Sequence, residues 1–215
     1  RRERESTPMV ETSMLRSPID RDPPRPSGRS DAAEATDVLL IGRVVAHDLT
    51  AFEALYRAYY PRLRRFVERM SSRPGIVDEV IDDTMLLVWN RADAYNHQSK
   101  VSTWIFAIAY RKALKALRHE GAAPAEDAAE DDRAAPDADP EQQASARETR
   151  GVLARALATL SCEHRAVLSL TYFHGMGYRE IAAIVECPID TVKTRMFHAR
   201  RRLRATLSGE LGDWL

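Results

Sequence analysis

Hydrophobic residues recur at helical spacing through two blocks of this chain, 36–119 and 149–208. In the first block the apolar positions begin with Leu39, Leu40, Val44, Phe52, Leu55, Tyr56, Tyr59, Leu63, Phe66, Val67 and Met70. Pro61 interrupts this run, and a proline there either kinks a helix or begins a new one, because it lacks an amide hydrogen. The pattern therefore predicts helices from the start of the first block.

The rest of the first block continues the helical pattern. Residues 71–75 read Ser-Ser-Arg-Pro-Gly, which is typical of a turn. A helix is predicted over 78–90, with an apolar stripe formed by Val77, Val80, Ile81, Thr84 and Val88. Residues 95–102 are polar and predict a loop. Ser102 is placed to cap a third helix that runs to Arg118.

The second block predicts shorter helices. Apolar residues recur from Val152 to Leu160, and another helix is expected over 163–173. Gly175 and Gly177 then end the helical pattern.

Residues 178–204 carry the most specific local pattern, two helices joined by a tight turn. Glu186-Cys187-Pro188 breaks the first helix, because proline biases the residue before it away from the helical conformation. Asp190 is placed to cap the second helix. Along that helix, steps of four, three and four residues predict a buried stripe of Val192, Met196, Ala199 and Leu203.

The other faces of this second helix are polar and cationic. Near its start, one face carries Lys193, Thr194, Phe197 and His198. Five arginines add charge with no acid among them: Arg195, Arg200, Arg201, Arg202 and Arg204. A DNA-binding helix-turn-helix has this arrangement, with the start of its second helix at the bases and its cations at the phosphates. The alternative is a solvated basic helix on an ordinary bundle, but the breaker, cap and divided faces together favour DNA.

Composition changes sharply between the two blocks. Residues 120–148 contain ten acids against Arg133 and Arg147 alone, which predicts a flexible acidic linker. Residues 1–35 are rich in Arg, Pro, Ser and Asp and predict a disordered N-terminal tail, and 209–215 are expected to form a C-terminal tail. The predicted fold is all-α, with two small helical domains at 36–119 and 149–208.

The distribution of charge, and the membrane, metal and catalytic motifs searched for in the sequence, restrict the possible functions further. The 32 basic and 32 acidic residues cancel, but their segregation leaves the 178–204 segment strongly basic. No apolar run reaches the roughly 18–20 residues of a membrane span, and no signal peptide is visible, so we expect a cytoplasmic protein without membrane insertion. Cys162 and Cys187 form no metal motif. No phosphate loop or nucleophile elbow is present, so we expect neither a cofactor nor an enzyme.

The order of the two blocks resembles the extracytoplasmic-function, or group IV, sigma factors of bacterial RNA polymerase. In the first block the resemblance rests on Tyr59-Tyr60-Pro61-Arg62-Leu63, on the segment 79–84 and on the segment 102–112. In the second it rests on Leu160, Val167-Leu168, the segment 178–182 and the segment 188–195. Each motif alone is weak, but both blocks in this order and at this separation are specific.

The resemblance implies that the first domain is region 2, which binds the polymerase and the promoter −10 element. The implied core polymerase contacts are Glu79, Asp82, Asp83, Met85, Leu86 and Trp89, although Trp89 can equally be a core residue. The implied −10 contacts are Asn96, His97, Gln98, Ser99, Lys100, Arg111, Lys112 and Lys115. Amides and hydroxyls can bond the edges of an unstacked base, and cations hold phosphates.

The second domain resembles region 4, which reads the −35 element as a duplex. The implied base contacts are Lys193, Thr194, Phe197 and His198, and the implied phosphate contacts are Arg179, Arg195 and Arg201. The implied partners are core RNA polymerase, promoter DNA and an anti-sigma factor. Two alternatives remain open: a helix-turn-helix regulator that acts without the polymerase, and a sigma mimic that sequesters an anti-sigma factor.

Overall fold

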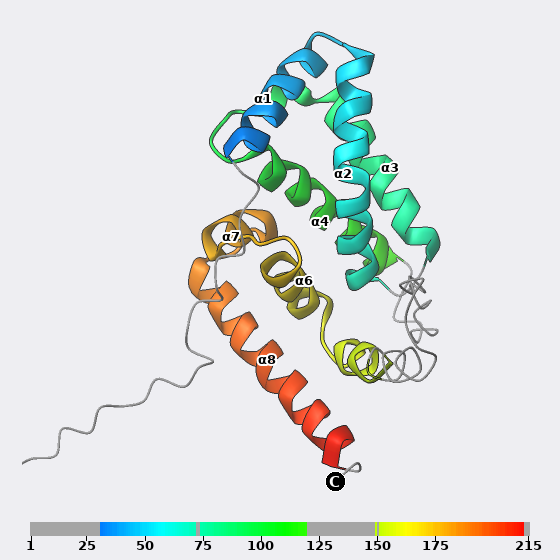
Figure 1. Cartoon of the computed structure of the whole chain (residues 1–215), viewed down its shortest axis with the longest axis vertical. Helices are drawn as coiled ribbons and strands as arrows, with labels where there is room; N and C mark the ends of the chain where they lie inside the picture. Colours follow the sequence, from blue (N-terminus) through cyan, green and yellow to red (C-terminus); the bar gives the residue numbers. More distant parts are fainter. Residues whose placement is uncertain (1–30, 72–73, 120–148, 150, 213–215) are drawn as a thin grey trace, which may run out of the picture.

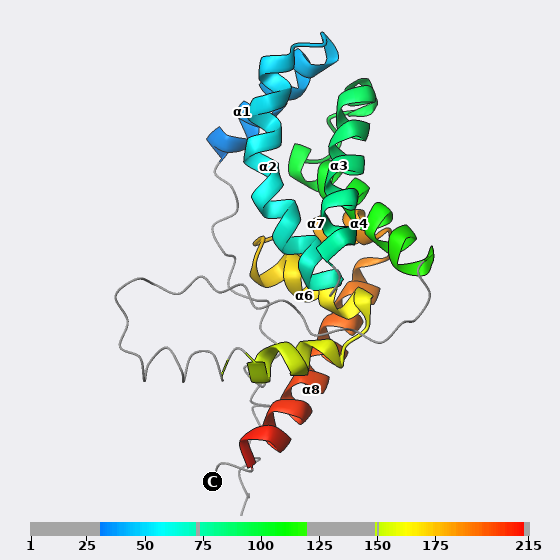
Figure 2. The same cartoon turned by 90° about the vertical axis from the view of Figure 1, so that its right-hand side faces the viewer.

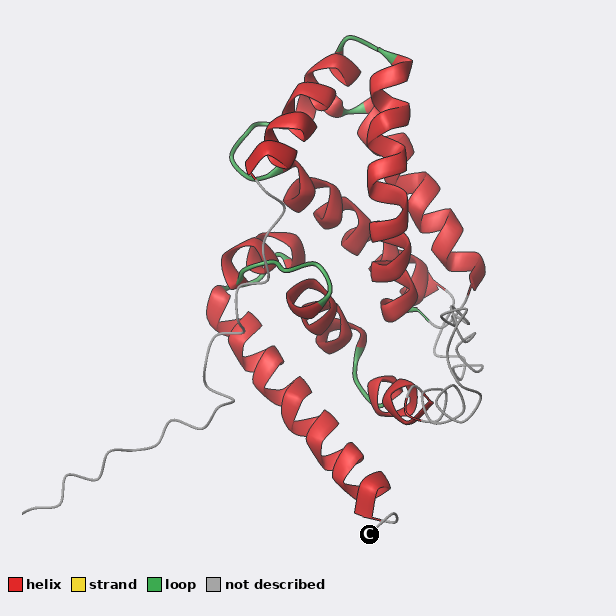
Figure 3. Ribbon diagram, viewed as in Figure 1, coloured by secondary structure: helices red, strands yellow, loops and turns green. Residues whose placement is uncertain are grey.

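The computed structural model describes residues 31–71, 74–119, 149 and 151–212, and every regular element in those ranges is helical (Figure 3). The elements are α1 (Asp31–Val45), α2 (Leu49–Met70), α3 (Pro74–Asn90), the short 3-10 helix η1 (Ala92–Ala94), α4 (Val101–His119), a helical stretch over 151–158, α6 (Cys162–Tyr172), α7 (Tyr178–Val185) and α8 (Ile189–Gly212). The predicted all-α class is confirmed. The predicted linker at 120–148 lies outside the described residues, as do 1–30 and 213–215.

Helix α1 begins at Asp31, inside the segment that was predicted to be tail. Its residue Glu34 is half-buried, and the Oε1 atom accepts a 2.7 Å hydrogen bond from the backbone amide of Val101. That amide is the first of α4 and has no acceptor within its own helix. The prediction that Ser102 caps α4 was therefore wrong: Ser102 lies within the first turn, and a carboxylate from α1 satisfies the helix start instead.

Asp48 connects α1 to α2. Its Oδ1 atom accepts hydrogen bonds from the amides of Thr50 (2.9 Å) and Ala51 (3.2 Å), which caps the start of α2. Its Oδ2 atom lies 2.7 Å from Nη2 of Arg43 in α1. The side-chain hydrogen bonds from Thr50 and then Arg43 hold the pKa of the Asp48 carboxyl well below its ordinary value. One carboxylate thus fixes the corner between the first two helices.

Helix α2 runs unbroken through Pro61, whose side chain is exposed, so the proline does not begin a new helix. The opposite face is buried over Ala51, Leu55, Tyr59, Leu63, Phe66, Val67 and Met70. The hydroxyl of the buried Tyr59 donates a 2.6 Å hydrogen bond to Oδ2 of Asp37. Because both residues are removed from water, this bond ties α2 to α1 in a specific register.

Helix α3 begins at Pro74, earlier than the predicted start at residue 78, because proline suits the first helical position. The predicted stripe is confirmed, since Val77, Val80, Ile81, Thr84 and Val88 are all buried. Helix α4 packs against α3 and α2. The rings of Phe66 and Phe106 meet edge to face across α2 and α4, with centroids 5.3 Å apart.

The second unit consists of α6, α7 and α8, which pack on one another. Ser161 caps α6 by accepting a hydrogen bond from the amide of His164. Helix α8 continues to Gly212, beyond the predicted end of this unit at residue 208.

The two units lie against each other in a single body. Helix α7 packs on α4, and α6 packs on α2, as Figures 1 and 2 show from two sides. The buried hydrophobic residues of both units form one contiguous cluster. The structure thus adds a seam between the two helical units that the sequence pattern does not predict.

Candidate nucleic-acid interface

Helices α7 and α8 form the predicted helix-turn-helix. The amide of Gly177 donates a 2.9 Å hydrogen bond to Oε2 of Glu180, which satisfies the start of α7. At the other end, Glu186 adopts the left-handed conformation (φ 52°, ψ 48°), which side chains other than glycine adopt infrequently. This residue turns the chain sharply, so that α8 restarts directly after Pro188.

Helix α8 divides into the two faces that its spacing predicts. Val192, Met196 and Ala199 are buried, and Leu203 is half-buried. All four predicted base contacts are exposed: Lys193, Thr194, Phe197 and His198. The Phe197 ring is 51% exposed on a helix of cations, where it is free to contact a thymine methyl. The base-reading role of this face stays a prediction.

Asp190 does not cap α8, because the helix already begins at Ile189. Its carboxylate lies in the first turn, where Oδ1 is 3.2 Å from Nζ of Lys193. Its backbone oxygen accepts a 2.9 Å hydrogen bond from Oγ1 of Thr194. An acid in the first turn interacts favourably with the helix dipole, and here it also positions the two polar side chains of the predicted reading face.

The three predicted phosphate contacts differ in their surroundings. Arg179 and Arg201 are exposed. Arg195 is half-buried and is hydrogen-bonded to the side chain of Tyr110 in α4. Burial raises the pKa of the Tyr110 hydroxyl, so the hydroxyl stays protonated. In this arrangement Arg195 faces the first unit rather than solvent.

The loop between η1 and α4 carries the predicted base-capturing residues. Asn96, His97 and Gln98 are exposed, and Ser99 is half-buried. The Asn96 side chain accepts a 3.1 Å hydrogen bond from the amide of Gln98, and His97 has a positive φ of 59°. The backbone oxygen of Ser99 accepts a 2.6 Å hydrogen bond from the Tyr95 hydroxyl. The loop is thus shaped by local bonds while three polar side chains point outward.

The cations near this loop are paired with acids. Nζ of Lys100 lies 2.8 Å from Oε1 of Glu180 in α7. On α4, Arg111 forms an ion pair with Glu186, and Nζ of Lys112 lies 2.7 Å from Oδ2 of Asp83 in α3. Lys115 is exposed. The predicted −10 cations therefore lie on α4 or directly before it, and two of them, Lys100 and Arg111, are paired with acids of the helix-turn-helix.

Helix α3 presents part of the predicted polymerase-binding face. Glu79 and Asp82 are exposed, Asp83 is half-buried, and Leu86 is 57% exposed. Met85 must be corrected: it is only 1% exposed and packs in the core, because it lies one residue away from the outward-facing Leu86.

Trp89 lies at the end of the same face and is half-buried. Its ring meets Phe52 edge to face with centroids 5.0 Å apart, and it meets His47 at 5.6 Å. Most of its role in the structure is therefore packing, with one part of the ring left at the surface beside Leu86.

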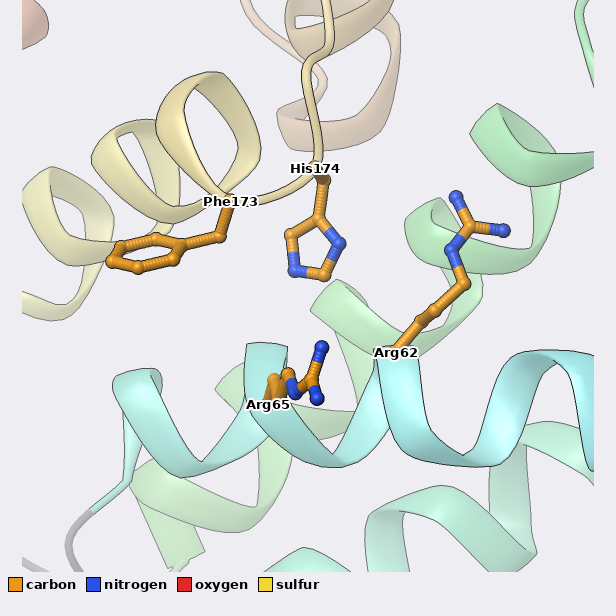
Figure 4. A pocket seen from close by; sticks show the side chains of 4 residues that line it. All are labelled: Arg62, Arg65, Phe173 and His174. Carbon is orange, nitrogen blue, oxygen red and sulfur yellow. The ribbon is translucent and has the colours of Figure 1, made fainter. Parts of the chain in front are cut away.

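Sequence reasoning missed His174, which lies between the units. Its ring is 4.7 Å from Phe106 and 6.0 Å from Phe66, centroid to centroid. Burial, followed by the nearby charges of Arg62, Arg69 and Arg65, lowers the pKa of this imidazole to about 3. His174, Arg62, Arg65 and Phe173 line a cavity of about 360 Å³. Figure 4 shows the imidazole on the same side of the cavity as Phe173, facing Arg62 and Arg65. No local pattern marks this residue, because its partners are distant in sequence.

Within the described ranges, no group of three or more His, Cys, Asp or Glu side chains is placed to hold a metal ion. No helix of those ranges has the length and apolar character needed to cross a membrane. Cys162 and Cys187 are both free and half-buried. Helix α8 presents an exposed aromatic and polar face surrounded by arginines, an arrangement typical of helix-turn-helix DNA-binding proteins.

Comparison with known proteins is consistent with a helix-turn-helix DNA-binding protein and points to one family within that class. The family described as Sigma-70 region 2 matches residues 55–123, and the family described as Sigma-70, region 4 matches residues 150–203. The ECF RNA polymerase sigma factor RpoE of Cereibacter sphaeroides is 29% identical over 184 residues, which cover 83% of this chain and 99% of the relative. The ECF RNA polymerase sigma-E factor of Escherichia coli K12 is 28% identical over 179 residues, covering 79% and 93%.

Two solved structures share the fold. CnrH in complex with the cytosolic domain of CnrY has a TM-score of 0.60 at 23% identity, covering 81% of this chain and 98% of CnrH. The sigma factor RpoE of Bartonella quintana in complex with the anti-sigma factor NepR has a TM-score of 0.59 at 24% identity, covering 74% and 98%. With both regions matched in order, the chain belongs to the extracytoplasmic-function sigma factors.

Proposed function

We propose that this chain binds core RNA polymerase and directs it to promoters by contacting a −10 element with its first unit and a −35 element with its second. Residues 36–119 and 149–208 are the two functional domains in this proposal. The observation that carries it is the exposed face of α8, where Lys193, Thr194, Phe197 and His198 stand together above a buried apolar stripe.

The proposal assigns the −35 duplex to this face. Lys193 donates to guanine acceptors, and Phe197 contacts a thymine methyl. Arg179 and Arg201 hold flanking phosphates, and Arg195 joins them once it leaves Tyr110. His198 supplies a further polar contact whose base preference depends on its protonation and tautomer.

The first unit has two roles in the proposal. The outward residues Asn96, His97 and Gln98 capture an unstacked base of the −10 element, with the α4 cations on the backbone. The exposed side of α3, with Glu79, Asp82 and Leu86, docks on the polymerase. An exposed leucine between acids is suited to a protein contact, because it combines apolar area with charge complementarity.

The partners follow from these roles. They are core RNA polymerase, promoter DNA and an anti-sigma factor. The two related folds support the last of these, because RpoE was solved with the anti-sigma factor NepR and CnrH was solved with the cytosolic domain of CnrY. Because the polymerase acts on the bacterial chromosome, the proposal places the chain in the cytoplasm.

The test adds the purified chain to core polymerase and maps transcript starts on fragmented genomic DNA. New starts that share two sequence elements are expected. Lys193→Ala with Phe197→Ala should reduce those starts, whereas Arg57→Ala, which removes an exposed cation of α2, should not. Core binding without new starts would favour a sigma mimic. Duplex binding without core binding would favour a conventional helix-turn-helix regulator.

A further inference from the structure

A cavity lies where α2 faces the end of α6 and the loop that follows it. Its volume of about 360 Å³ is at the lower end of the range for small-molecule sites. Arg62 and Arg65 of α2 line one side, and Phe173 and His174 line the other, as Figure 4 shows. None of these four side chains belongs to the proposed DNA or polymerase contacts. The cavity therefore has no role in the proposed function.

The α2 side of the cavity is cationic. Arg62, Arg65 and Arg69 are three and four residues apart, which places them along one side of the helix. Within the described ranges, neither Arg62 nor Arg65 forms an ion pair with an acid, whereas Arg57 and Arg64 of the same helix are both paired. A hollow lined by charges of one sign attracts counter-ions, because a bound ion relieves the repulsion between them. The cavity is therefore suited to an anion.

The guanidinium of Arg62 is held in place by two aromatic rings. Its central carbon lies 4.9 Å from the centroid of the Tyr59 ring and 5.3 Å from that of the Phe106 ring. Such contacts with ring faces stabilise a cation. Its Nη1 atom is buried and has no hydrogen-bond partner among the residues that the structure describes. A buried charged donor without a partner costs free energy, and an anionic oxygen in the cavity removes that cost.

The imidazole of His174 presents a second unsatisfied nitrogen at the same cavity. Its Nε2 atom is buried and lacks a hydrogen-bond partner in the described part of the chain. A neutral imidazole carries one N–H group, so this nitrogen can donate to an oxygen. Because Arg62 and His174 both line the cavity, small rotations of these side chains bring their nitrogens to a bound oxygen. The site thus offers donors from both sides and has no carboxylate in its lining.

We propose that this cavity binds a small phosphate-bearing anion, with Arg62 and Arg65 on the phosphate oxygens and His174 donating a further hydrogen bond. A phosphate group carries up to two negative charges and three acceptor oxygens, so one group can bridge two arginines. The planar fork of a guanidinium also matches the spacing of phosphate oxygens. This site goes beyond the proposed function and does not depend on it.

Arg65 allows a substitution that leaves the fold intact, because its side chain is exposed. Arg65→Gln removes one cation of the cavity, and Arg65→Lys keeps the charge but loses the guanidinium fork. The matched control is Arg57→Gln, which removes an exposed arginine of the same helix that is paired with Glu53. All three variants are compared with the parent as full-length proteins.

The experiment titrates sodium pyrophosphate into each protein by calorimetry, in a phosphate-free buffer of low ionic strength. The parent should bind one pyrophosphate saturably. Arg65→Gln should weaken binding about fivefold to tenfold, the range for losing one hydrogen bond to a charged group at a partly exposed site. Arg65→Lys should fall between the two, and Arg57→Gln should match the parent. Proton NMR should show the His174 imidazole signals shifting as pyrophosphate is added, and the pKa of the imidazole should rise because the anion offsets the nearby arginines.

Parallel titrations with inorganic phosphate and with ADP distinguish the sources of the phosphate group. Tighter binding of ADP than of pyrophosphate would support the site and identify a nucleotide as its ligand. Equal binding would support recognition of the phosphate groups alone. Three results would overturn the proposal. They are the absence of saturable binding, an equal loss of affinity in Arg57→Gln, and a titration that shifts signals of α8 while those of His174 stay unchanged.

Discussion

Acidification should weaken the structure through His174, and the size of the effect can be worked out. The imidazole pKa is about 3 in the folded protein, against 6.5 for a solvated histidine. Between those values the unfolded chain binds a proton that the folded chain does not, so folding stability falls as the pH drops below 6.5. At pH 5 the unfolded imidazole is almost fully protonated, and the linkage relation gives a loss of about 2 kcal/mol relative to neutral pH.

The cause of this loss is the environment of the ring. His174 is enclosed by Phe66 and Phe106, and Arg62, Arg65 and Arg69 of α2 add positive charge that opposes protonation.

Urea unfolding at pH 7 and pH 5 tests the prediction, with His174→Gln as the comparison. The variant lacks the titrating group, so the parent protein should lose about 2 kcal/mol more than the variant on acidification. Proton NMR of the imidazole gives the pKa directly. A His174 that titrates near 6.5, or equal acid sensitivity in both proteins, would show that the ring is solvated and that the reasoning is wrong.

Three further outcomes are expected. Phe66→Ala removes a ring that is fully buried against Phe106, so urea unfolding should show a loss of about 3–5 kcal/mol. Glu34→Ala leaves the first amide of α4 without its acceptor and should lower the unfolding free energy by about 1–3 kcal/mol, while Glu34→Gln should restore most of it. Phe197→Ala should leave the melting temperature unchanged, since the ring is 51% exposed, yet reduce promoter-duplex affinity in a gel-shift assay with the polymerase holoenzyme.

Periodicity predicts much of this fold, because helix packing is decided by which residues share a face. The stripe on α3 and the stripe on α8 are both buried as their spacing predicts. The turn between α7 and α8 was also predictable, since Pro188 cannot continue a helix. Helix starts were less predictable: Ser102 and Asp190 have capping side chains, but α4 is capped by Glu34 and α8 begins before Asp190.

In the candidate site too, the features set by the helical period were predictable and those set by contacts between distant residues were not. Exposure of Lys193, Thr194, Phe197 and His198 follows from the helical period alone. The seam could not be predicted from local sequence, because each of its contacts joins residues that are distant along the chain, such as Lys100 with Glu180. Met85 was misassigned for a related reason: its neighbours in the core come from other helices, and burial depends on them.

The packing of His174 over Phe66 and Phe106 affects the solubility of the protein. If the units part, Phe66 and Phe106 lose the side chain that packs over them, and an aromatic surface that faced protein then faces water. An opened chain without polymerase should therefore associate with itself as concentration rises. The solubility of the protein therefore depends on the same few rings that join the two units.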